Sequence, residues 1–274
     1  MNELDINNPQ LPDFIVPGAD EKKQDEPAKI KVIGVGGGGG NAVNHMYHQG
    51  IGGVSFVLCN TDAQALRNSP VPVKVQLGAK GEGAGNIPEV AKKLAEESAA
   101  EVEALFDDNT RMAFITAGMG GGTGTGAAPV VARIAKEKGV LTVGIVTIPF
   151  LFEGEPKILQ AFAGVEEMRK HVDALLVINN ERLCKIYPDL SWTTAFAKAD
   201  DSLSNAARSI AELVSKDGKI NLDFADVRTT LKDGGAAVIS TGSGEGEHRM
   251  SRAIQNALTS PLLKESDIYG AERV

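Results

Sequence analysis

The stretch that decides the fold is Gly118-Met-Gly-Gly-Gly-Thr-Gly-Thr-Gly126. An apolar, β-rich run at 112–117 precedes it, and an apolar segment of helical character at 127–135 follows it. The pattern therefore predicts a strand, a glycine loop and the N-terminus of a helix. Glycine lets backbone N–H groups approach a ligand closely, and a helix N-terminus adds unpaired donors and a positive dipole end. This arrangement favours phosphate binding over a flexible surface loop.

A second glycine-rich segment occurs earlier in the chain. Residues 29–36 are typical of a strand that runs into glycines 36–40, and a helix is predicted to open at Asn41. The segment matches the G-x-G-x-x-G dinucleotide fingerprint, which is weak when it occurs alone. The next strand, 54–59, leads to Asp62, and an acid about 20 residues after the glycines suits a Rossmann ribose site. A nicotinamide-dependent oxidoreductase is therefore one hypothesis.

Composition limits the partners. The chain has 274 residues and a formal net charge of −8, so no basic field of the whole molecule attracts nucleic acid or anionic lipid. Cys59 and Cys184 lie far apart and outside any CxxC motif, which indicates reduced thiols in a cytoplasmic protein. No apolar run approaches membrane-spanning length, and no signal peptide is present. We expect a cytoplasmic protein without direct membrane insertion and without nucleic-acid binding.

The order of predicted elements favours one fold class. Residues 1–28 are polar, acidic and rich in proline, which predicts a disordered leader. After it, strands alternate with helices, which indicates an α/β fold with a parallel, doubly wound sheet. Ligands of such sheets bind beyond the carboxyl ends of the strands. The predicted strands are 29–36, 54–59, 73–77, 112–117, 140–148, 174–179 and 236–241, and the later helices are 154–171, 193–217 and 247–259.

Two glycine loops at one edge of the sheet change the balance of hypotheses. A Rossmann enzyme needs one such loop for its pyrophosphate, whereas a longer polyphosphate can use both. The P-loop pattern G-x-x-x-x-G-K-[ST] is absent. Phosphate charge would therefore be met by backbone N–H groups, helix dipoles and Mg²⁺ rather than by a P-loop lysine.

Five motifs in register resemble the tubulin/FtsZ family, and within it FtsZ, the bacterial tubulin-like cell-division GTPase. They are Gly36-Gly-Gly-Gly-Gly-Asn41, Asn60-Thr-Asp-Ala-Gln64, Gly118-Met-Gly-Gly-Gly-Thr-Gly-Thr-Gly-Ala-Ala-Pro129, Pro149-Phe-Leu-Phe-Glu-Gly154 and Asn221-Leu-Asp-Phe-Ala-Asp226. The resemblance begins near Lys29 and implies a Rossmann-like GTP-binding domain at 29–192 and a central helix at 193–217. Residues 218–274 would then start an incomplete α+β C-terminal subdomain.

The resemblance also implies a nucleotide site for GTP or GDP with Mg²⁺. Glu153 would contact the ribose, and Lys157 stands where the family usually has arginine, whose planar fork lysine lacks. Asn180 and Asp200, with Phe196 nearby, would recognise guanine. Without the resemblance, Asp200 would be interpreted as a solvated helix charge. The residues implied in phosphate binding are Gly37, Gly38, Gly39, Gly40, Asn41, Gly122, Thr123 and Gly124.

Hydrolysis is implied to involve Asp223 and Asp226, which would reach the nucleotide of the next subunit in a head-to-tail filament. Their carboxylates would position the attacking water, although the residues alone favour Asp226 as a helix N-cap. The resemblance implies a cytokinetic ring at the midcell division site. It also implies that membrane adaptors and division-ring proteins bind a C-terminal tail absent from this chain. The alternative is a nucleotide-dependent structural polymer with little GTPase activity.

Overall fold

A seven-stranded parallel sheet forms the centre of the computed structural model, which describes residues 30–107, 109–187, 189, 191–215, 224–240 and 242–258. The strand order is β3-β2-β1-β4-β5-β6-β7, and all the pairings are parallel. The predicted leader at 1–28 lies outside the described residues. The strands are β1 (Ile30–Val35), β2 (Ser55–Asn60), β3 (Val73–Gln76), β4 (Met112–Gly118), β5 (Leu141–Ile148), β6 (Ala174–Asn179) and β7 (Gly235–Ala236).

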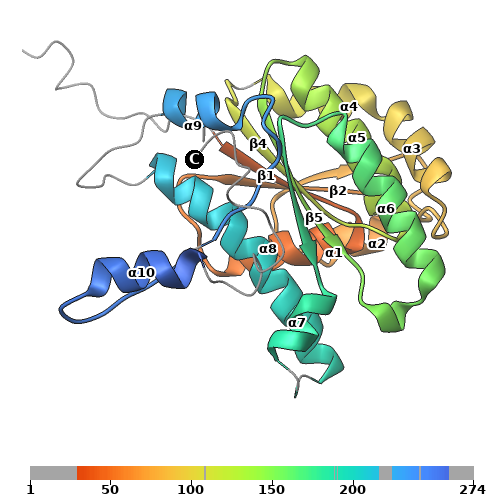
Figure 1. The fold of residues 1–274 in the computed structure, drawn as a ribbon. Helices are drawn as coiled ribbons and strands as arrows, with labels where there is room; N and C mark the ends of the chain where they lie inside the picture. Colours follow the sequence, from red (N-terminus) through yellow and green to blue (C-terminus); the bar gives the residue numbers. More distant parts are fainter. Residues whose placement is uncertain are drawn as a thin grey trace, which may run out of the picture.

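Helices cover both faces of the sheet, which confirms the predicted α/β class (Figure 1). One apolar cluster packs α3, α5 and α6 on one face, and a second packs α1, α8 and α9 on the other. The helices are α1 (Gly36–His48), α2 (Ala63–Arg67), α3 (Pro88–Glu97), α4 (Ala99–Glu103), α5 (Gly122–Glu137), α6 (Glu155–Arg169), α7 (Glu181–Ile186), α8 (Trp192–Ser215), α9 (Phe224–Leu231) and α10 (Arg249–Leu258), with 3₁₀ turns η1 (Ala104–Phe106) and η2 (Leu151–Glu153).

The strand side chains explain why the sheet is buried on both faces. In β1, Ile33 and Val35 join the cluster under α5, while Ile30 and Val32 join the cluster under α8. All eight residues of β5 are buried. This is the pattern expected of a central parallel strand, because crossover helices exclude water from both of its faces.

Helices α1 and α5, which follow the two glycine-rich motifs, begin earlier than the sequence predicts. Helix α1 starts at Gly36 rather than at Asn41, and α5 starts at Gly122 rather than after Gly126. The glycines at 36–40, together with Gly122, Gly124 and Gly126, therefore lie at the starts of helices instead of in loops, while Gly120 and Gly121 form the turn before α5. Helix propensity places glycine outside helices, but here packing against neighbouring backbone outweighs that preference.

The C-terminal elements differ most from expectation. The predicted strand 236–241 is only the two-residue β7, whose ladder to β6 ends at the hydrogen bond from Ala237 N to Leu175 O (2.9 Å). Helix α10 projects away from the sheet, and none of its residues is buried (Figure 1). The domain boundaries at 192 and 217 stay a prediction.

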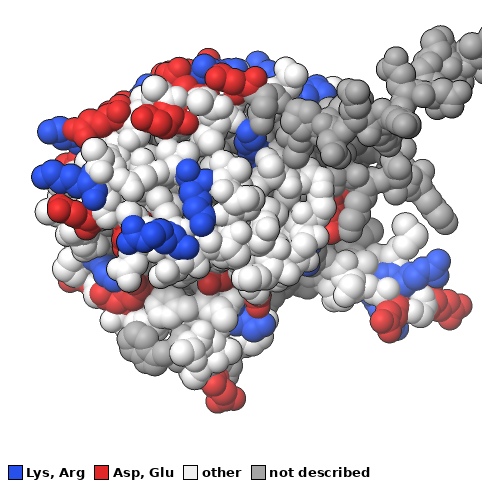
Figure 2. Space-filling model, turned by 180° about the vertical axis from the view of Figure 1, so that it is seen from behind, with Lys and Arg blue, Asp and Glu red and all other residues white. Residues whose placement is uncertain are grey.

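Charged side chains of both signs share the surface seen in Figure 2, where lysine and arginine are interspersed with aspartate and glutamate along the periphery. Arg133 illustrates the pairing, because its guanidinium contacts Glu96 at 2.7 Å and Glu137 at 3.1 Å. Among the helices of the described residues, none has the length and apolar character needed to cross a bilayer.

Candidate functional site

Two glycine-rich helix N-termini meet at the carboxyl edge of the sheet. Strands β1 and β4 are parallel neighbours, so the chain leaves both at the same edge and enters α1 and α5 there. Gly36 has a positive φ of 74°, and a Cβ on it would lie 2.7 Å from the Gly124 nitrogen. A Cβ on Gly38 would lie 3.2 Å from the Gly118 Cα. The strand order reverses between β1 and β4, which is where ligands of doubly wound sheets bind.

The glycines of α5 are needed for internal packing. A Cβ on Gly124 would lie 2.3 Å from the Gly118 carbonyl oxygen, and one on Gly126 would lie 1.9 Å from the Pro88 carbonyl oxygen. Gly122 approaches the Ile87 nitrogen in the same way, at 2.8 Å. Because atoms cannot approach so closely, any larger residue would push α5 away from α3 and β4.

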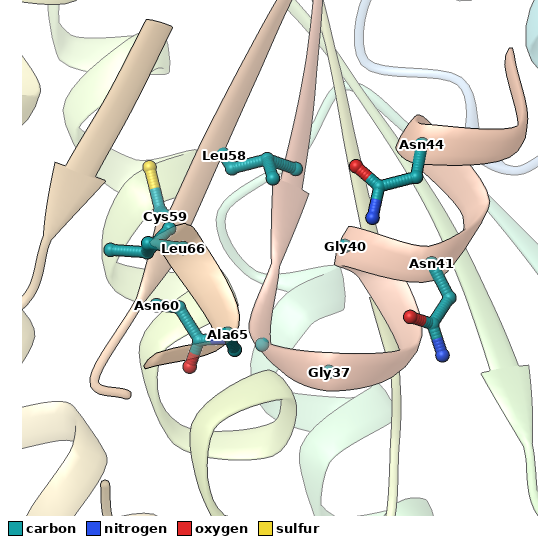
Figure 3. Close-up of a pocket in the computed structure, with 10 residues that line it drawn as sticks. Gly37, Gly40, Asn41, Asn44, Leu58, Cys59, Asn60, Ala65 and Leu66 are labelled. Carbon is teal, nitrogen blue, oxygen red and sulfur yellow. The ribbon is translucent and has the colours of Figure 1, made fainter. Parts of the chain in front are cut away.

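Two glycines of α1 have no such packing role. Apart from chain neighbours and the backbone of α1 itself, no heavy atom lies within 4 Å of the Cβ position of Gly37 or Gly40, and both residues line a hollow of about 50 Å³ (Figure 3). Glycine in a helix is destabilising by about 1 kcal/mol relative to alanine. Packing within the described part of the chain therefore does not explain glycine at these two positions. Gly39, in contrast, is buried against the Thr116 carbonyl oxygen.

The lining of the hollow suits an anion held by backbone groups. Asn41 and Asn44 of α1 and Asn60 of β2 contribute amides, and the lining residues include no lysine or arginine. Burial raises the pKa of the Cys59 thiol to about 12, so this neighbour stays protonated and does not act as a nucleophile. Backbone N–H groups and the dipole of α1 are thus the sources of positive potential here.

Hydroxyl and amide side chains fix the glycine turn that precedes α5. The Thr125 hydroxyl accepts a hydrogen bond from the Gly120 N–H at 2.9 Å, and Gln160 Nε2 donates to the Gly120 and Gly121 carbonyls at 3.1 Å. The hydroxyls of Thr61 and Thr123 lie 2.7 Å apart and join the end of β2 to α5. Sequence reasoning assigned no role to Thr61 or Gln160, although Thr61 lies inside one of the five motifs.

The Asp62 side chain has a structural role. Its carboxylate accepts hydrogen bonds from the backbone N–H groups of Gln64 (2.8 Å) and Ala65 (3.3 Å) and thereby caps α2. An N-cap carboxylate satisfies donors that the helix itself leaves unpaired. The spacing that suggested a Rossmann ribose acid is therefore explained by the start of a helix.

Glu153 and Lys157, the expected ribose and phosphate contacts, lie together where η2 leads into α6. The Lys157 ammonium is 3.4 Å from Glu153 Oε2, and Glu153 Oε1 accepts from the Phe150 N–H at 3.0 Å. A Cβ on Gly120 would lie 2.7 Å from the Lys157 carbonyl oxygen, so this turn contacts the glycine turn directly. Lys157 is exposed enough to exchange its carboxylate partner for a phosphate.

The three residues expected at the base lie at the ends of β6 and α8. Asn180 is 5% exposed, yet its Oδ1 atom has no hydrogen-bond partner among the described residues. Phe196 is 41% exposed and contacts the ring of Phe150, with 5.3 Å between the ring centroids. Its exposure leaves one side of the ring open. A buried oxygen with no partner among the described residues can accept a further hydrogen bond.

The pKa of the Asp200 carboxyl is higher than the ordinary value for aspartate. Its pKa is raised to about 6, mainly by burial; His45 lowers it, and the neighbouring Asp201 makes a smaller contribution that raises it. His45 is held by Asp201, with 2.8 Å between Nε2 and Oδ1, so α1 and α8 are tied together beside this carboxyl. A half-buried carboxyl of raised pKa is typical of a group that awaits a hydrogen-bonding partner.

Asp226 lies far from this edge. It is an exposed residue in the first turn of α9, whose first residue, Phe224, packs against Arg111 just before β4. The glycine turn follows the other end of β4, and seven residues of strand span about 20 Å. Asp226 is therefore remote from the hollow of its own chain. Asp223, the other expected catalytic residue, lies outside the described residues.

Comparisons with known proteins agree with this geometry. The family profile described as "Tubulin/FtsZ family, GTPase domain" matches residues 29–188. The cell division protein FtsZ of Porphyromonas gingivalis is 66% identical over 252 residues, which cover 90% of this chain and 55% of that protein. FtsZ of Aquifex aeolicus is 48% identical over 252 residues, which cover 90% of this chain and 68% of that protein. The chain thus spans little more than half the length of the Porphyromonas relative.

Solved structures give the same result. The empty FtsZ dimer of M. jannaschii has a TM-score of 0.82 and 45% identity, over 88% of this chain and 71% of that one. The GDP-bound CetZ1 monomer of Haloferax volcanii has a TM-score of 0.72 and 25% identity, over 84% and 73% of the two chains. The family profile covers the first four of the five motifs and six of the seven strands of the sheet. The chain therefore belongs to the Tubulin/FtsZ family, and residues 29–188 form the GTPase domain of that family.

Proposed function

We propose that the protein binds GTP at the carboxyl edge of β1 and β4 and hydrolyses it within a head-to-tail filament of identical subunits. The observation that carries this proposal is the pair of open glycines, Gly37 and Gly40, on a helix N-terminus packed against a second one. The β- and γ-phosphates lie against the first turns of α1 and α5, held by Gly37–Asn41 and Gly122–Gly124. One helix N-terminus suits one phosphate group, and two suit a polyphosphate.

Guanine is the base that the remaining side chains fit. The Asp200 carboxylate accepts from N1–H and the exocyclic amine of guanine, and adenine offers no such pair of donors. The unpaired Asn180 Oδ1 accepts a further donor, and the open side of Phe196 packs on the ring. Glu153 contacts the ribose, and Lys157 contributes charge near the phosphates. The GDP-bound CetZ1 relative supports a guanine nucleotide in this fold.

Hydrolysis requires a second subunit. Asp226 lies beside the start of β4, whereas the glycine turn follows its end, about 20 Å of strand away, so this carboxylate does not reach the nucleotide of its own subunit. Stacking subunits head to tail brings Asp223 and Asp226 of one subunit to the γ-phosphate of the next, where they orient and polarise the attacking water. The M. jannaschii FtsZ dimer supports self-association in this family.

Mg²⁺ fits this site as an ion carried by the nucleotide. Among the described residues, no group of three or more His, Cys, Asp or Glu side chains could hold a metal on its own. Mg²⁺ commonly binds through substrate phosphates and water with one or two protein ligands, and its chemistry here is neutralisation of phosphate charge. Asp223 and Asp226 are the residues that would approach its outer hydration shell.

The cellular role follows from the relatives named above. We propose that the filaments contribute to the cytokinetic ring at the midcell division site, in the cytoplasm. Membrane adaptors and division-ring proteins would be further partners of the filament. Turnover would arise because loss of the γ-phosphate weakens the interface that it helps to build.

The test is GTP hydrolysis measured against protein concentration with Mg²⁺, with light scattering followed in parallel. We expect specific activity to rise above a threshold concentration, together with scattering. Asp223→Ala and Asp226→Ala should abolish hydrolysis and leave binding of a fluorescent GTP analogue intact, while Glu166→Ala on the surface of α6 serves as the matched control. Activity independent of concentration would contradict a shared site.

Mixing two inactive variants tests the shared site more directly. Asp226→Ala subunits keep an intact GTP pocket, and Gly40→Arg subunits keep the carboxylates but fill the hollow. A mixture should recover activity if pocket and carboxylates come from different subunits. A mixture that stays inactive, although each variant co-sediments with the parent protein, would place both parts of the site in one chain. Assembly without turnover in the parent protein would favour the structural polymer instead.

A further inference from the structure

Arg111 and Phe224 form a contact that joins the sheet to the first turn of α9. The guanidinium carbon of Arg111 lies 4.1 Å from the centroid of the Phe224 ring. A cation within about 6 Å of a ring face is attracted by its quadrupole. Arg111 directly precedes β4, and Phe224 is the first residue of α9 and only 8% exposed.

We propose that Arg111 is a positioning residue for the hydrolytic carboxylate of Asp226. The inference rests on the proposed function above and concerns how the catalytic end of the subunit is held. Phe224 precedes Asp226 by two residues in the first turn of α9. A contact that fixes the Phe224 ring therefore constrains the turn of helix that carries Asp226.

The burial pattern of α9 explains why one contact has this influence. Phe224 and Val227 are buried in the cluster under α8, whereas Ala225 and Asp226 are exposed on the other side of the helix. A helix of eight residues has little stability of its own and depends on such anchors. Rotation of α9 about its axis is thus controlled mainly by Phe224 and Val227, and it decides where Asp226 points.

The backbone of Arg111 is held in place by the sheet. Its carbonyl oxygen accepts a hydrogen bond from the Leu141 N–H at 3.0 Å, which ties the residue to the ladder between β4 and β5. The guanidinium reaches the Phe224 ring from this fixed backbone. The sheet, rather than α9 itself, therefore sets the position of the first turn of that helix.

The experiment compares Arg111→Met and Arg111→Lys in the full chain. Turnover is measured per sedimented subunit, so that reduced assembly is separated from slower hydrolysis. We expect Arg111→Met to lower kcat about fivefold, with KM and GTP affinity unchanged, because a cation–π contact of ordinary strength is lost. Arg111→Lys should retain most of the rate. Arg169→Met, at the end of α6, is the matched control.

A double-mutant comparison tests whether the two side chains act as a pair. Phe224→Leu keeps the apolar anchor but removes the ring face, and Arg111→Met with Phe224→Leu should be no slower than Phe224→Leu alone. Effects that multiply would overturn the proposal. So would an unchanged kcat in Arg111→Met.

Hydrogen exchange gives a readout that does not depend on assembly or on hydrolysis. The amides of 225–231 should exchange faster in Arg111→Met than in the parent protein and the Lys variant, while those of α5 stay unchanged. Equal exchange of α9 in all three proteins would refute the positioning role. Failure of the proposed function looks different, because hydrolysis in the parent protein would then be insensitive to Asp226→Ala.

Discussion

The first turns of α1 and α5 contain glycine for different reasons. In α5, Gly122, Gly124 and Gly126 are each pressed against the backbone of another segment, at Cβ distances of 2.8, 2.3 and 1.9 Å. In α1, Gly37 and Gly40 have no neighbour within 4 Å of the Cβ position and line the hollow. The three glycines of α5 are thus needed for packing, whereas α1 combines a packed glycine, Gly39, with two that leave open space.

The difference separates stability from binding within one site. A larger residue in α5 disturbs packing whether or not nucleotide is present. A larger residue at an open position of α1 leaves the packing intact and occupies the space that we assign to phosphate. Substitutions at the packed glycines of α5 should mainly lower stability, whereas substitutions at the open glycines of α1 should mainly lower GTP affinity.

The largest effect is expected for Gly126→Ala in α5. The added methyl group would overlap the Pro88 carbonyl oxygen, so α3 and α5 must separate, at a cost of about 3 kcal/mol in the free energy of unfolding. Urea denaturation followed by circular dichroism measures this loss. Unfolding at the same urea concentration as the parent protein would show that the helices are not packed as described.

Gly40→Ala in α1 should show the opposite profile. The free energy of unfolding should stay equal or rise by up to about 1 kcal/mol, because alanine favours the helix. GTP affinity should fall at least about tenfold, since the methyl group enters the hollow and breaks a charge-assisted hydrogen bond. Titration with a fluorescent GTP analogue and thermal unfolding test the two parts. Unchanged affinity would remove the central support for the phosphate site.

Asp200→Asn extends the comparison to the base end of the site. Burial raises the pKa of Asp200 to about 6 in the folded protein, above the value of about 3.9 in an unfolded chain. Its contribution to stability is therefore present below about pH 4 and is lost as the pH rises through about 6. The neutral variant should gain about 2 °C in Tm at pH 7.5, because the carboxyl is partly exposed and solvent screens its charge.

The gain in stability should vanish below pH 4, and thermal unfolding across pH 4 to 8 measures it. Binding should change in the other direction, because an amide at this position accepts only one of the two guanine donors. The variant should lose affinity for GTP and gain affinity for xanthosine triphosphate, whose second carbonyl accepts from the amide. Unaltered preference between the two nucleotides would move Asp200 away from the base.

Several features could be predicted because local patterns dictate them. The apolar runs at 112–117 and 140–148 are too hydrophobic to lie anywhere but inside a parallel sheet, and the structure has β4 and β5 there. The predicted first residues of α1 and α5 were wrong by about one turn. Glycine has a low helix propensity, and contact with neighbouring backbone, which the sequence does not show, outweighs it here.

The roles of Asp62, Gly39 and Gly40 depend on which segments of the chain contact one another in the fold. The spacing before Asp62 fitted a ribose site equally well, and the carboxylate became a cap only because the chain turns into α2 directly after it. Nothing in the sequence distinguished Gly40 from Gly39, since both are glycine in one run. The strand β4 makes the difference, because it lies against Gly39 and leaves Gly40 open.

The sequence by itself determined the alternating order of strands and helices, the parallel sheet and the family, because these follow from hydrophobic periodicity and motif spacing along the chain. The tertiary structure alone decided which glycines are packed and which line the hollow, and that Asp226 lies at the opposite edge from the glycines. It also joined Arg111 to Phe224 across 112 intervening residues. Those properties arise from contacts between distant segments, and contacts of that kind leave no periodic signal in a single sequence.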